Sequence, residues 1–289
     1  MAEVATFAMS DQLLVVIDPV ALRTDGESVR IAKDVLSAGA ATKVCLPQGP
    51  EEFARALARR GSRRPVVVGD DRALMRAVSL LHRQRQLAEC VLSVVPVGAA
   101  LSLAGSLGVP TGAVAAARAV LEGVERRLDL LVDDSDGVVL GALRIPPIRD
   151  AEPSAGANGA TAVGPGAGRP WLRTCQSLVR TLVPTRGTLP GESGPSRLRV
   201  EVDGTTLVDL DQPVEAVSVA PGAAGVAEVE VRPASVGAEA SPLRAEGRTV
   251  TVSGAHFRYR ADAAVSGPVR TRTWEVREGA WGLTVPAVG

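Results

Sequence analysis

The sequence predicts an α/β plus all-β fold: an N-terminal Rossmann-like parallel sheet with helices, followed by a C-terminal antiparallel β-sandwich. Three observations support this. Strand-like and helix-like runs alternate through the first half, as in crossover units. A segment rich in Pro, Gly, Ala and Ser follows at Glu152–Arg169, and short alternating runs separated by turn signals begin at Leu198. We expect an α/β domain over residues 1–147, a linker over 148–197 and a sandwich domain over 198–289.

The α/β half opens on Leu13–Ile17, a continuous apolar run typical of a strand buried on both faces. The other expected strands are Thr42–Leu46, Arg64–Val68 and Val91–Val95. Helical spacing of apolar residues predicts helices at Glu27–Ala38, Pro50–Arg60, Ala73–Gln86 and Thr111–Glu125. Ligands of parallel sheets bind beyond the carboxyl ends of the strands. The candidate ligand-binding segments are therefore Asp18–Pro19, Gly69–Arg72 and Pro96–Ala100.

The pattern of the second half predicts a linker followed by strands. Within the linker, Trp171–Val183 has the pattern of a short amphipathic helix. Its only basic residues are Arg173 and Arg180, which favours packing against protein over lying on a membrane. The expected strands are Leu198–Val202, Val214–Val219, Ala227–Val231, Thr249–Val252, His256–Arg260, Thr271–Val276 and Gly282–Val285.

Composition excludes several function classes. The chain has 289 residues and a formal net charge of zero, which disfavours a nucleic-acid binder. The cysteines, Cys45, Cys90 and Cys175, are too far apart for a metal site and odd in number for a disulfide framework. No secretory signal or membrane-spanning apolar run is evident. We expect a cytoplasmic protein whose membrane contact, if it has one, is peripheral at the inner face.

Several segments occur in a characteristic order. The first strand ends in VVIDP, the third continues as VVVGDDRALMRAV over Val66–Val78, and the fourth leads into PVGAALSLAGSLGVP over Pro96–Pro110. An alanine-rich helix and an Arg-x-Asp strand with Arg127 and Asp129 follow, and VEVDG occurs at Val200–Gly204. In order and spacing these segments resemble the diacylglycerol kinase catalytic family, which includes bacterial soluble lipid kinases and shares a fold with NAD kinases. The resemblance covers nearly the whole chain.

The resemblance implies an ATP-dependent lipid phosphotransferase that uses Mg²⁺ and a lipid such as diacylglycerol, with peripheral membrane contact. It places a catalytic carboxylate at Asp262. We assign no metal-ligating residues. The nucleotide-binding positions that it implies are Asp18, Gly69, Asp70, Asp71, Arg72, Gly98 and Ala99.

The motif residues depart from the family pattern. Where the family has Gly-Gly-Asp-Gly-Thr, this chain has Gly69-Asp70-Asp71-Arg72-Ala73, and side chains hinder the close approach of backbone N–H groups to phosphate. The Thr, Asn and Asp of the second motif correspond to Ala99, Leu101 and Ser102. The family's late Asp-Gly-Glu aligns with Asp262, Ala263 and Ala264, so a carboxylate suited to general-base catalysis is missing.

Three hypotheses follow. The chain is an active kinase with an altered loop, a pseudokinase that binds a nucleotide, a lipid or a protein, or a regulatory protein that binds no nucleotide. A single preorganised donor is worth about 2–4 kcal/mol of transition-state stabilisation, so the combined losses favour weak or lost activity. Arg72 either contacts a phosphate or folds over Asp70 or Asp71 and occupies the phosphate space.

Other polar residues have structural interpretations. Asp71 is explained at least as well as the N-cap or a first-turn acid of the following helix as it is by a nucleotide contact. The acidic run Asp133, Asp134, Asp136 is better explained as a hairpin turn than as a cation site. His82 is expected on a solvated helix face and His256 is expected to pack in a strand.

Overall fold

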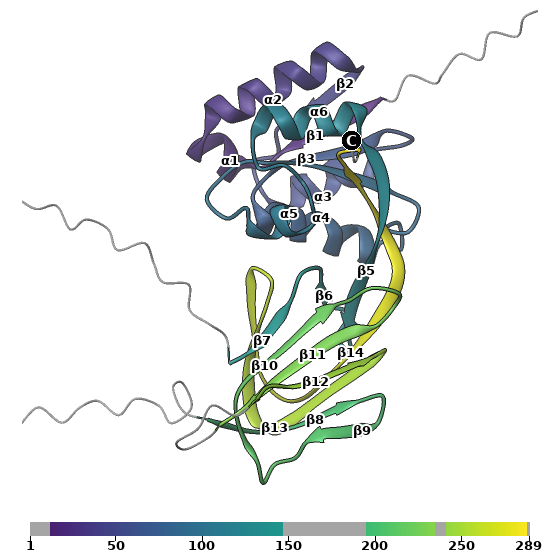
Figure 1. The fold of residues 1–289 in the computed structure, drawn as a ribbon. Helices are drawn as coiled ribbons and strands as arrows, with labels where there is room; N and C mark the ends of the chain where they lie inside the picture. The colour runs from purple at the N-terminus through teal and green to yellow at the C-terminus, as the bar shows by residue number, and fades with distance from the viewer. Residues whose placement is uncertain (1–11, 147–194, 235–240, 288–289) are drawn as a thin grey trace, which may run out of the picture.

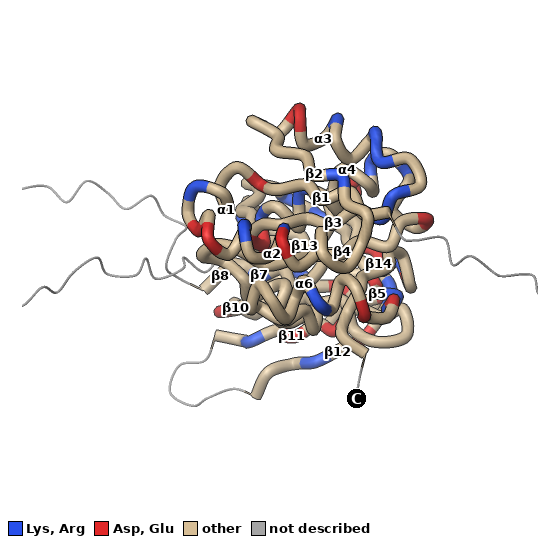
Figure 2. Tube along the Cα trace, turned by 90° about the horizontal axis from the view of Figure 1, so that it is seen from above, with Lys and Arg blue, Asp and Glu red and all other residues tan. Residues whose placement is uncertain are grey.

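The computed structural model describes residues 12–146, 195–234 and 241–287. An α/β half lies above a β half in Figure 1, and long strands connect the two. Most of the predicted linker, its helix at Trp171–Val183 and Cys175 lie outside the described residues. Basic and acidic residues are interspersed over the α/β half (Figure 2), in line with the net charge of zero.

The α/β half contains every strand and helix predicted before residue 124, with shifts of at most three residues at their ends. Two short helices were not predicted, one after the first strand and one after the fourth. The elements are β1 (Leu13–Ile17), α1 (Pro19–Thr24), α2 (Gly26–Gly39), β2 (Thr42–Cys45), α3 (Pro50–Ala58), β3 (Arg64–Gly69), α4 (Asp71–Arg83), β4 (Val91–Pro96), α5 (Ser102–Ser106) and α6 (Ala113–Glu122).

The remaining described elements are all strands. The last four predicted strands merge in pairs into two long ones, and the short strands β6, β7, β9 and β12 were not predicted. The elements are β5 (Val124–Asp133), β6 (Val138–Val139), β7 (Leu143–Ile145), β8 (Ser196–Val202), β9 (Thr205–Val208), β10 (Pro213–Pro221), β11 (Ala227–Pro233), β12 (Leu243–Gly247), β13 (Thr249–Ala261) and β14 (Ala264–Val285).

The predicted fold class, a Rossmann-like parallel sheet followed by a separate antiparallel sandwich, is wrong. The described strands form one 14-stranded sheet in which antiparallel pairs predominate. The parallel neighbours β2, β1, β3 and β4 are only one end of it, because β4 pairs directly with β14, the last strand of the chain. β14 in turn pairs antiparallel with β5 and β13. Hydrophobic periodicity identifies strands but does not identify their partners, which explains the error.

The β half is also not a sandwich of two stacked sheets. β13 pairs with β8, β8 with β10, β10 with β7, and β7 with β13, so these four strands close into a small barrel. Its buried side chains include Leu143, Val200, Val217 and Val250. Alternating burial along a strand is common to sandwiches and barrels. The sequence pattern therefore could not distinguish them.

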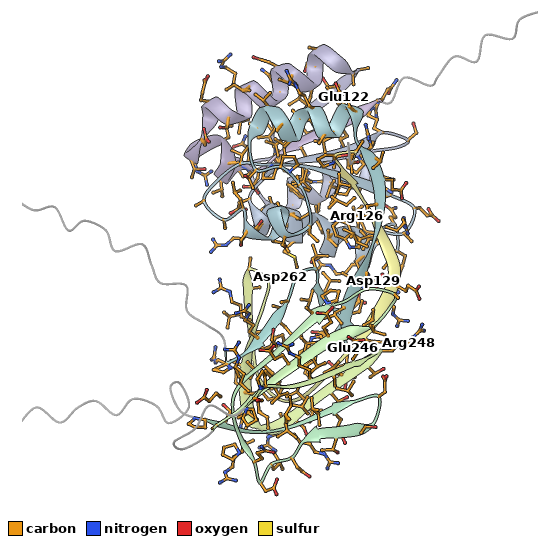
Figure 3. The ribbon with its side chains drawn as sticks, viewed as in Figure 1. Glu122, Arg126, Asp129, Glu246, Arg248 and Asp262 are labelled. Carbon is orange, nitrogen blue, oxygen red and sulfur yellow. The ribbon has the colours of Figure 1, made fainter. Side chains whose placement is uncertain are left out.

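A bulge in β14 marks the passage between the two halves. The β5–β14 register shifts between Arg277 and Trp281, and Gly279 there has a positive φ of 52°. The Asp129 carboxylate accepts hydrogen bonds from the amides of Gly279, at 2.7 Å, and of Gly225, at 2.9 Å. Asp129, labelled between the halves in Figure 3, thus holds the bulge and the loop before β11 together.

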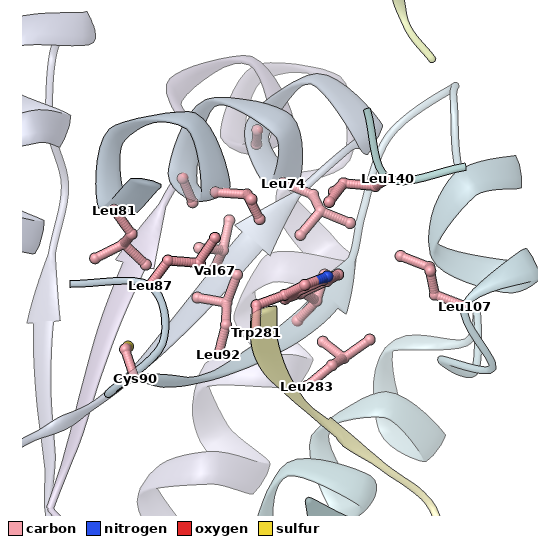
Figure 4. Packing of buried hydrophobic residues seen from close by; sticks show 14 of the residues in the cluster. Val67, Leu74, Leu81, Leu87, Cys90, Leu92, Leu107, Leu140, Trp281 and Leu283 are labelled. Atoms are coloured by element: carbon pink, nitrogen blue, oxygen red, sulfur yellow. The ribbon is translucent and has the colours of Figure 1, made fainter. Parts of the chain in front are cut away.

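Beyond the bulge, β14 completes the core of the α/β half. Trp281 is fully buried there, and Figure 4 shows it among Val67 of β3, Leu74 of α4 and Leu92 of β4. A second core cluster fills the other side of the sheet, where α2 and α6 pack. The C-terminal strand is therefore an integral part of the α/β half.

We predict that Trp281→Ala lowers the free energy of unfolding by about 3–5 kcal/mol, because it opens a cavity in the shared core. Trp281→Phe keeps a large aromatic group and should cost much less. Denaturant unfolding of the two variants and the natural protein measures both effects. An unchanged stability for Trp281→Ala would show that β14 does not contribute to this core.

Candidate functional site

The candidate site lies at the carboxyl ends of β1, β3 and β4. Gly69 ends β3 and sits against the residue that follows β1, because a Cβ built on it would lie 3.0 Å from the Cβ of Asp18. A Cβ on Gly98, after β4, would lie 3.2 Å from the Cβ of Asp70. The structure therefore brings together Asp18, Gly69, Asp70, Asp71 and Gly98, as the strand order predicts.

Gly69 has a steric role. An added Cβ would lie 2.6 Å from the Cβ of Ala73, which is closer than real Cβ atoms approach. The glycine thus lets the first turn of α4 pack directly on the end of β3. Gly98 has a φ of +129°, a conformation that L side chains rarely adopt, so it shapes the turn after β4. Ala99 beside it is exposed and offers no polar side-chain atom.

Asp70 is the N-cap of α4. Its backbone is extended, and its carboxylate Oδ1 accepts hydrogen bonds from the amides of Arg72 and Ala73, both at 3.1 Å. These amides belong to the first turn, where a helix has no backbone acceptors of its own and attracts anions. The chain's own carboxylate therefore occupies the end of α4 that faces the loop after β4.

Asp71 is buried and points at the neighbouring helix. Its two carboxylate oxygens accept from the amides of Leu103, at 2.9 Å, and Ala104, at 3.1 Å, and from the Ser102 hydroxyl at 3.3 Å. α5 has no side-chain cap of its own, so Asp71 caps it from α4. Asp71 is a first-turn acid of α4, as predicted, and Asp70 rather than Asp71 is the N-cap of that helix. The cap that Asp71 provides for α5 was not predicted.

Asp18 is also buried and fully engaged. One carboxylate oxygen accepts from the amide of Val20 and caps α1, and the other pairs with Arg76 Nη1 at 2.6 Å. The Arg76 guanidinium also lies over the Phe53 ring, 5.5 Å from its centroid. This cation–π contact holds the arginine against the helix surface. Sequence reasoning missed Arg76, because nothing local connects it with a residue 58 positions away.

Asp262 lies in the turn between β13 and β14, at the tip of the hairpin that reaches toward the α/β half (Figure 3). Its carboxylate accepts from the amides of Leu140, Gly141 and Ala142, at 2.7, 2.8 and 3.0 Å. Burial raises the pKa of its carboxyl group, and the negative charge of Asp71 raises it further. The three hydrogen bonds lower this pKa, but burial outweighs them. Asp262 thus lies near the other site residues but anchors the loop before β7.

Arg72 is the predicted site residue whose side chain is least engaged. It is exposed, and no described carboxylate lies within ion-pair distance of its guanidinium, so it does not fold over Asp70 or Asp71. It borders a hollow of about 420 Å³ between α4 and the β half. The opposite wall includes Val139 of β6 and Ala264 of β14.

The acidic run forms a hairpin turn, as predicted. β5 and β6 pair antiparallel, and Asp133 Oδ1 accepts from the amides of Ser135 and Gly137, both at 2.8 Å. Among the described residues, no group of three or more potential ligands is arranged to hold a metal ion. Within the part of the chain that the structure describes, the carboxylates of the site are engaged in structural contacts, and the Arg72 guanidinium has no carboxylate partner.

Both histidine predictions need correction. The side chain of His82 is only 15% exposed and bonds through Nε2 to Asp136 Oδ1 at 2.9 Å, so it connects α4 to the β5–β6 turn. His256 is exposed, and its Nε2 accepts from Arg270 Nε at 3.3 Å. Both partners are distant in sequence, which is why local pattern did not indicate them.

Within the described residues, the helices are too short or too polar to cross a bilayer.

No protein-family model matches the chain, and no curated protein matches it. Solved structures do. A candidate diacylglycerol kinase from Bacillus anthracis str. Sterne matches with a TM-score of 0.70 and 12% identity, covering 96% of this chain and 98% of that one. A structure of a diacylglycerol kinase from the same organism matches with a TM-score of 0.66 and 11% identity, covering 96% and 97%. The chain therefore has the fold of these proteins.

We predict that Asp262→Ala lowers the free energy of unfolding by about 1–3 kcal/mol, because three backbone amides lose their acceptor. Asp209→Ala is a suitable control, since Asp209 is exposed and, among the described residues, its carboxylate accepts only from the amide of its neighbour Leu210. Denaturant unfolding measures both variants. If Asp262→Ala were as stable as the control, Asp262 would not be anchoring residues 140–142.

Proposed function

We propose that this chain, which has the fold of structurally characterised diacylglycerol kinases, is a member of that family with weak or lost phosphotransfer activity. The observation that carries the proposal is the carboxylate of Asp70 on the amides of Arg72 and Ala73. In a glycine-rich loop, the amides at the start of the following helix are the groups that receive phosphate. Here a phosphate would have to displace a carboxylate that belongs to the same helix.

Electrostatics adds to this steric conflict. An aspartate beside the helix terminus repels an approaching triphosphate, and the nearby Asp71 adds a second negative charge. Arg72 does not neutralise these two charges by pairing with them, because its guanidinium makes no ion pair with either aspartate. The end of α4 is therefore a poor acceptor for a nucleotide.

The carboxylates needed for catalysis are also committed. Asp18 pairs with Arg76, Asp71 caps α5, and Asp262 holds the loop before β7. The position that aligns with the family's late glutamate is Ala264, whose methyl group cannot accept the proton of a lipid hydroxyl. Residual transfer would still require ATP, Mg²⁺ and a diacylglycerol-like lipid at the cytoplasmic membrane face.

The alternative within this proposal is a pseudokinase that binds a ligand without transferring a phosphoryl group. The feature that favours it is the hollow beside α4, which is present among the described residues although the end of the helix is capped by Asp70. Such a protein would act by binding a lipid or regulating a partner.

We predict that ATP·Mg²⁺ raises the melting temperature of the natural protein little or not at all. Asp70→Gly removes the carboxylate that the amides of Arg72 and Ala73 share. It should therefore make the melting temperature rise with ATP·Mg²⁺ concentration, because a ligand stabilises the state that it binds. Asp25→Gly is the control, since Asp25 is the N-cap of a different helix, α2, where its carboxylate accepts from the amide of Ser28. Thermal unfolding across a nucleotide titration measures all three proteins.

A robust response of the natural protein to ATP·Mg²⁺, together with transfer of labelled γ-phosphate to diacylglycerol, would contradict the proposed loss of activity. An Asp70→Gly variant that responds no better than Asp25→Gly would show that Asp70 is not what keeps the nucleotide out.

A further inference from the structure

Four arginines lie at the end of the α/β half opposite the candidate site. A helix that connects parallel strands runs back against them, so α3 and α4 end beside the amino ends of β3 and β4. Arg59 is the C-cap of α3, Arg60 and Arg63 lie in the turn before β3, and Arg83 is the last residue of α4. We call these four residues the arginine face, and Figure 2 shows basic positions beside α3 and α4.

Contacts within the chain connect these arginines without neutralising them. Arg60 Nη1 donates to Gln86 Oε1 in the turn after α4, and Arg63 Nη1 donates to the carbonyl oxygen of Arg60 at 3.4 Å. Arg83 Nε donates to the carbonyl oxygen of Ser79 at 3.3 Å. Among the described residues, none of the four guanidinium groups has a carboxylate within ion-pair distance.

The helix ends account for only part of this positive charge. The carboxyl end of a helix carries roughly half a negative charge, so the ends of α3 and α4 favour nearby arginines. Glu89, in the turn before β4, is exposed and has no ion-pair partner in the described part of the chain. After Glu89 and the two helix ends are counted, the arginine face still carries about two positive charges. Such a surface attracts an anionic partner.

The distribution of the charge favours an extended acidic segment over a small anion. Arg60 and Arg63 border a hollow of about 530 Å³, but the carboxylates of Glu89 and Glu125 line the same hollow and would repel an anion inside it. Packed helices lie about 8–10 Å apart. Carboxylates two residues apart on an extended chain are about 7 Å apart, so neighbouring ones can reach arginines at both helix ends.

A membrane surface fits the arginine face less well. Peripheral membrane sites combine basic residues with several apolar side chains that enter the interface. Among the described residues, the turns that carry the four arginines contain no exposed large apolar side chain. Leu46, which is exposed, lines a hollow with Arg59 alone of the four. One leucine is too little for insertion.

We propose that the arginine face binds an acidic segment of a partner protein in an extended conformation. Its carboxylates contact guanidinium groups from both helix ends. Arginine binds a carboxylate through two parallel hydrogen bonds, which gives geometric specificity as well as attraction. The arginine face and the candidate site lie at opposite ends of the same strands, so the two do not compete. The inference goes beyond the proposed function and holds whether or not the chain transfers a phosphoryl group.

The test is fluorescence anisotropy of the full chain with a labelled synthetic peptide in which Glu and Ser alternate. We expect saturable binding by the natural protein, which weakens as salt is added because the contacts lie at the surface. Arg59→Glu/Arg83→Glu should bind the peptide at least tenfold more weakly. Both side chains are exposed, so the variant is expected to fold, and its melting temperature checks this.

The matched control is Arg23→Glu/Arg118→Glu, which makes the same change in charge. Arg23 of α1 and Arg118 of α6 are exposed and have no carboxylate partner among the described residues. Their helices contribute to the core cluster on the other side of the sheet. This variant should bind the peptide within about twofold of the natural protein.

Further measurements separate the proposed partner from other ligands. A peptide with Gln in place of Glu should not bind, and inorganic pyrophosphate should not displace the acidic peptide at concentrations near the dissociation constant of the peptide. Absence of peptide binding, equal weakening in the control variant, or displacement by pyrophosphate at those concentrations would overturn the inference. Arginine-dependent sedimentation with phosphatidylglycerol vesicles without peptide binding would assign the face to a membrane instead. Arginine-dependent dimerisation in analytical ultracentrifugation without peptide binding would assign it to a second copy of the chain.

Discussion

The hydrogen bonds from the amides of Arg72 and Ala73 to the Asp70 carboxylate are the constraint on which the site depends. They satisfy the start of α4 from within the chain, at a helix terminus of the kind that attracts anions. The neighbouring carboxylates of Asp71 and Asp18 also have partners within the chain. Asp71 turns to α5 and Asp18 to Arg76, so the site persists as a network of helix caps and one ion pair.

The same site depends on contacts between the two halves of the molecule. β14 runs from the barrel into the α/β core, where Trp281 is buried, and Asp129 holds its bulge. At the other end of β14, Asp262 fixes the loop before β7, and a Cβ on Gly141 in that loop would lie 2.8 Å from Leu103 of α5. The hollow beside α4 is therefore bounded by elements whose relative position is set by the long final strand.

Sequence pattern was sufficient for the positions of most helices and strands, because apolar spacing is a local property. It placed Asp18, Gly69 and Gly98 at strand ends that converge in space. It could not supply pairings such as that of β4 with β14, whose paired residues lie about 190 positions apart, and the predicted fold class was wrong for that reason. The sequence pattern also did not predict the ion pair of Asp18 with Arg76, because these residues are 58 positions apart. The cap formed by Asp70 had a local signal, because an aspartate just before a helix is a common N-cap. Its position in place of a loop glycine instead led to its prediction as a nucleotide-binding residue.

The most direct test of this account is a crystal structure of the natural protein grown with a high concentration of ATP·Mg²⁺. The account predicts that Asp70 stays on the amides of Arg72 and Ala73 and that no phosphate lies at the start of α4. Phosphate density bonded to those two amides, with the Asp70 side chain turned away, would contradict it.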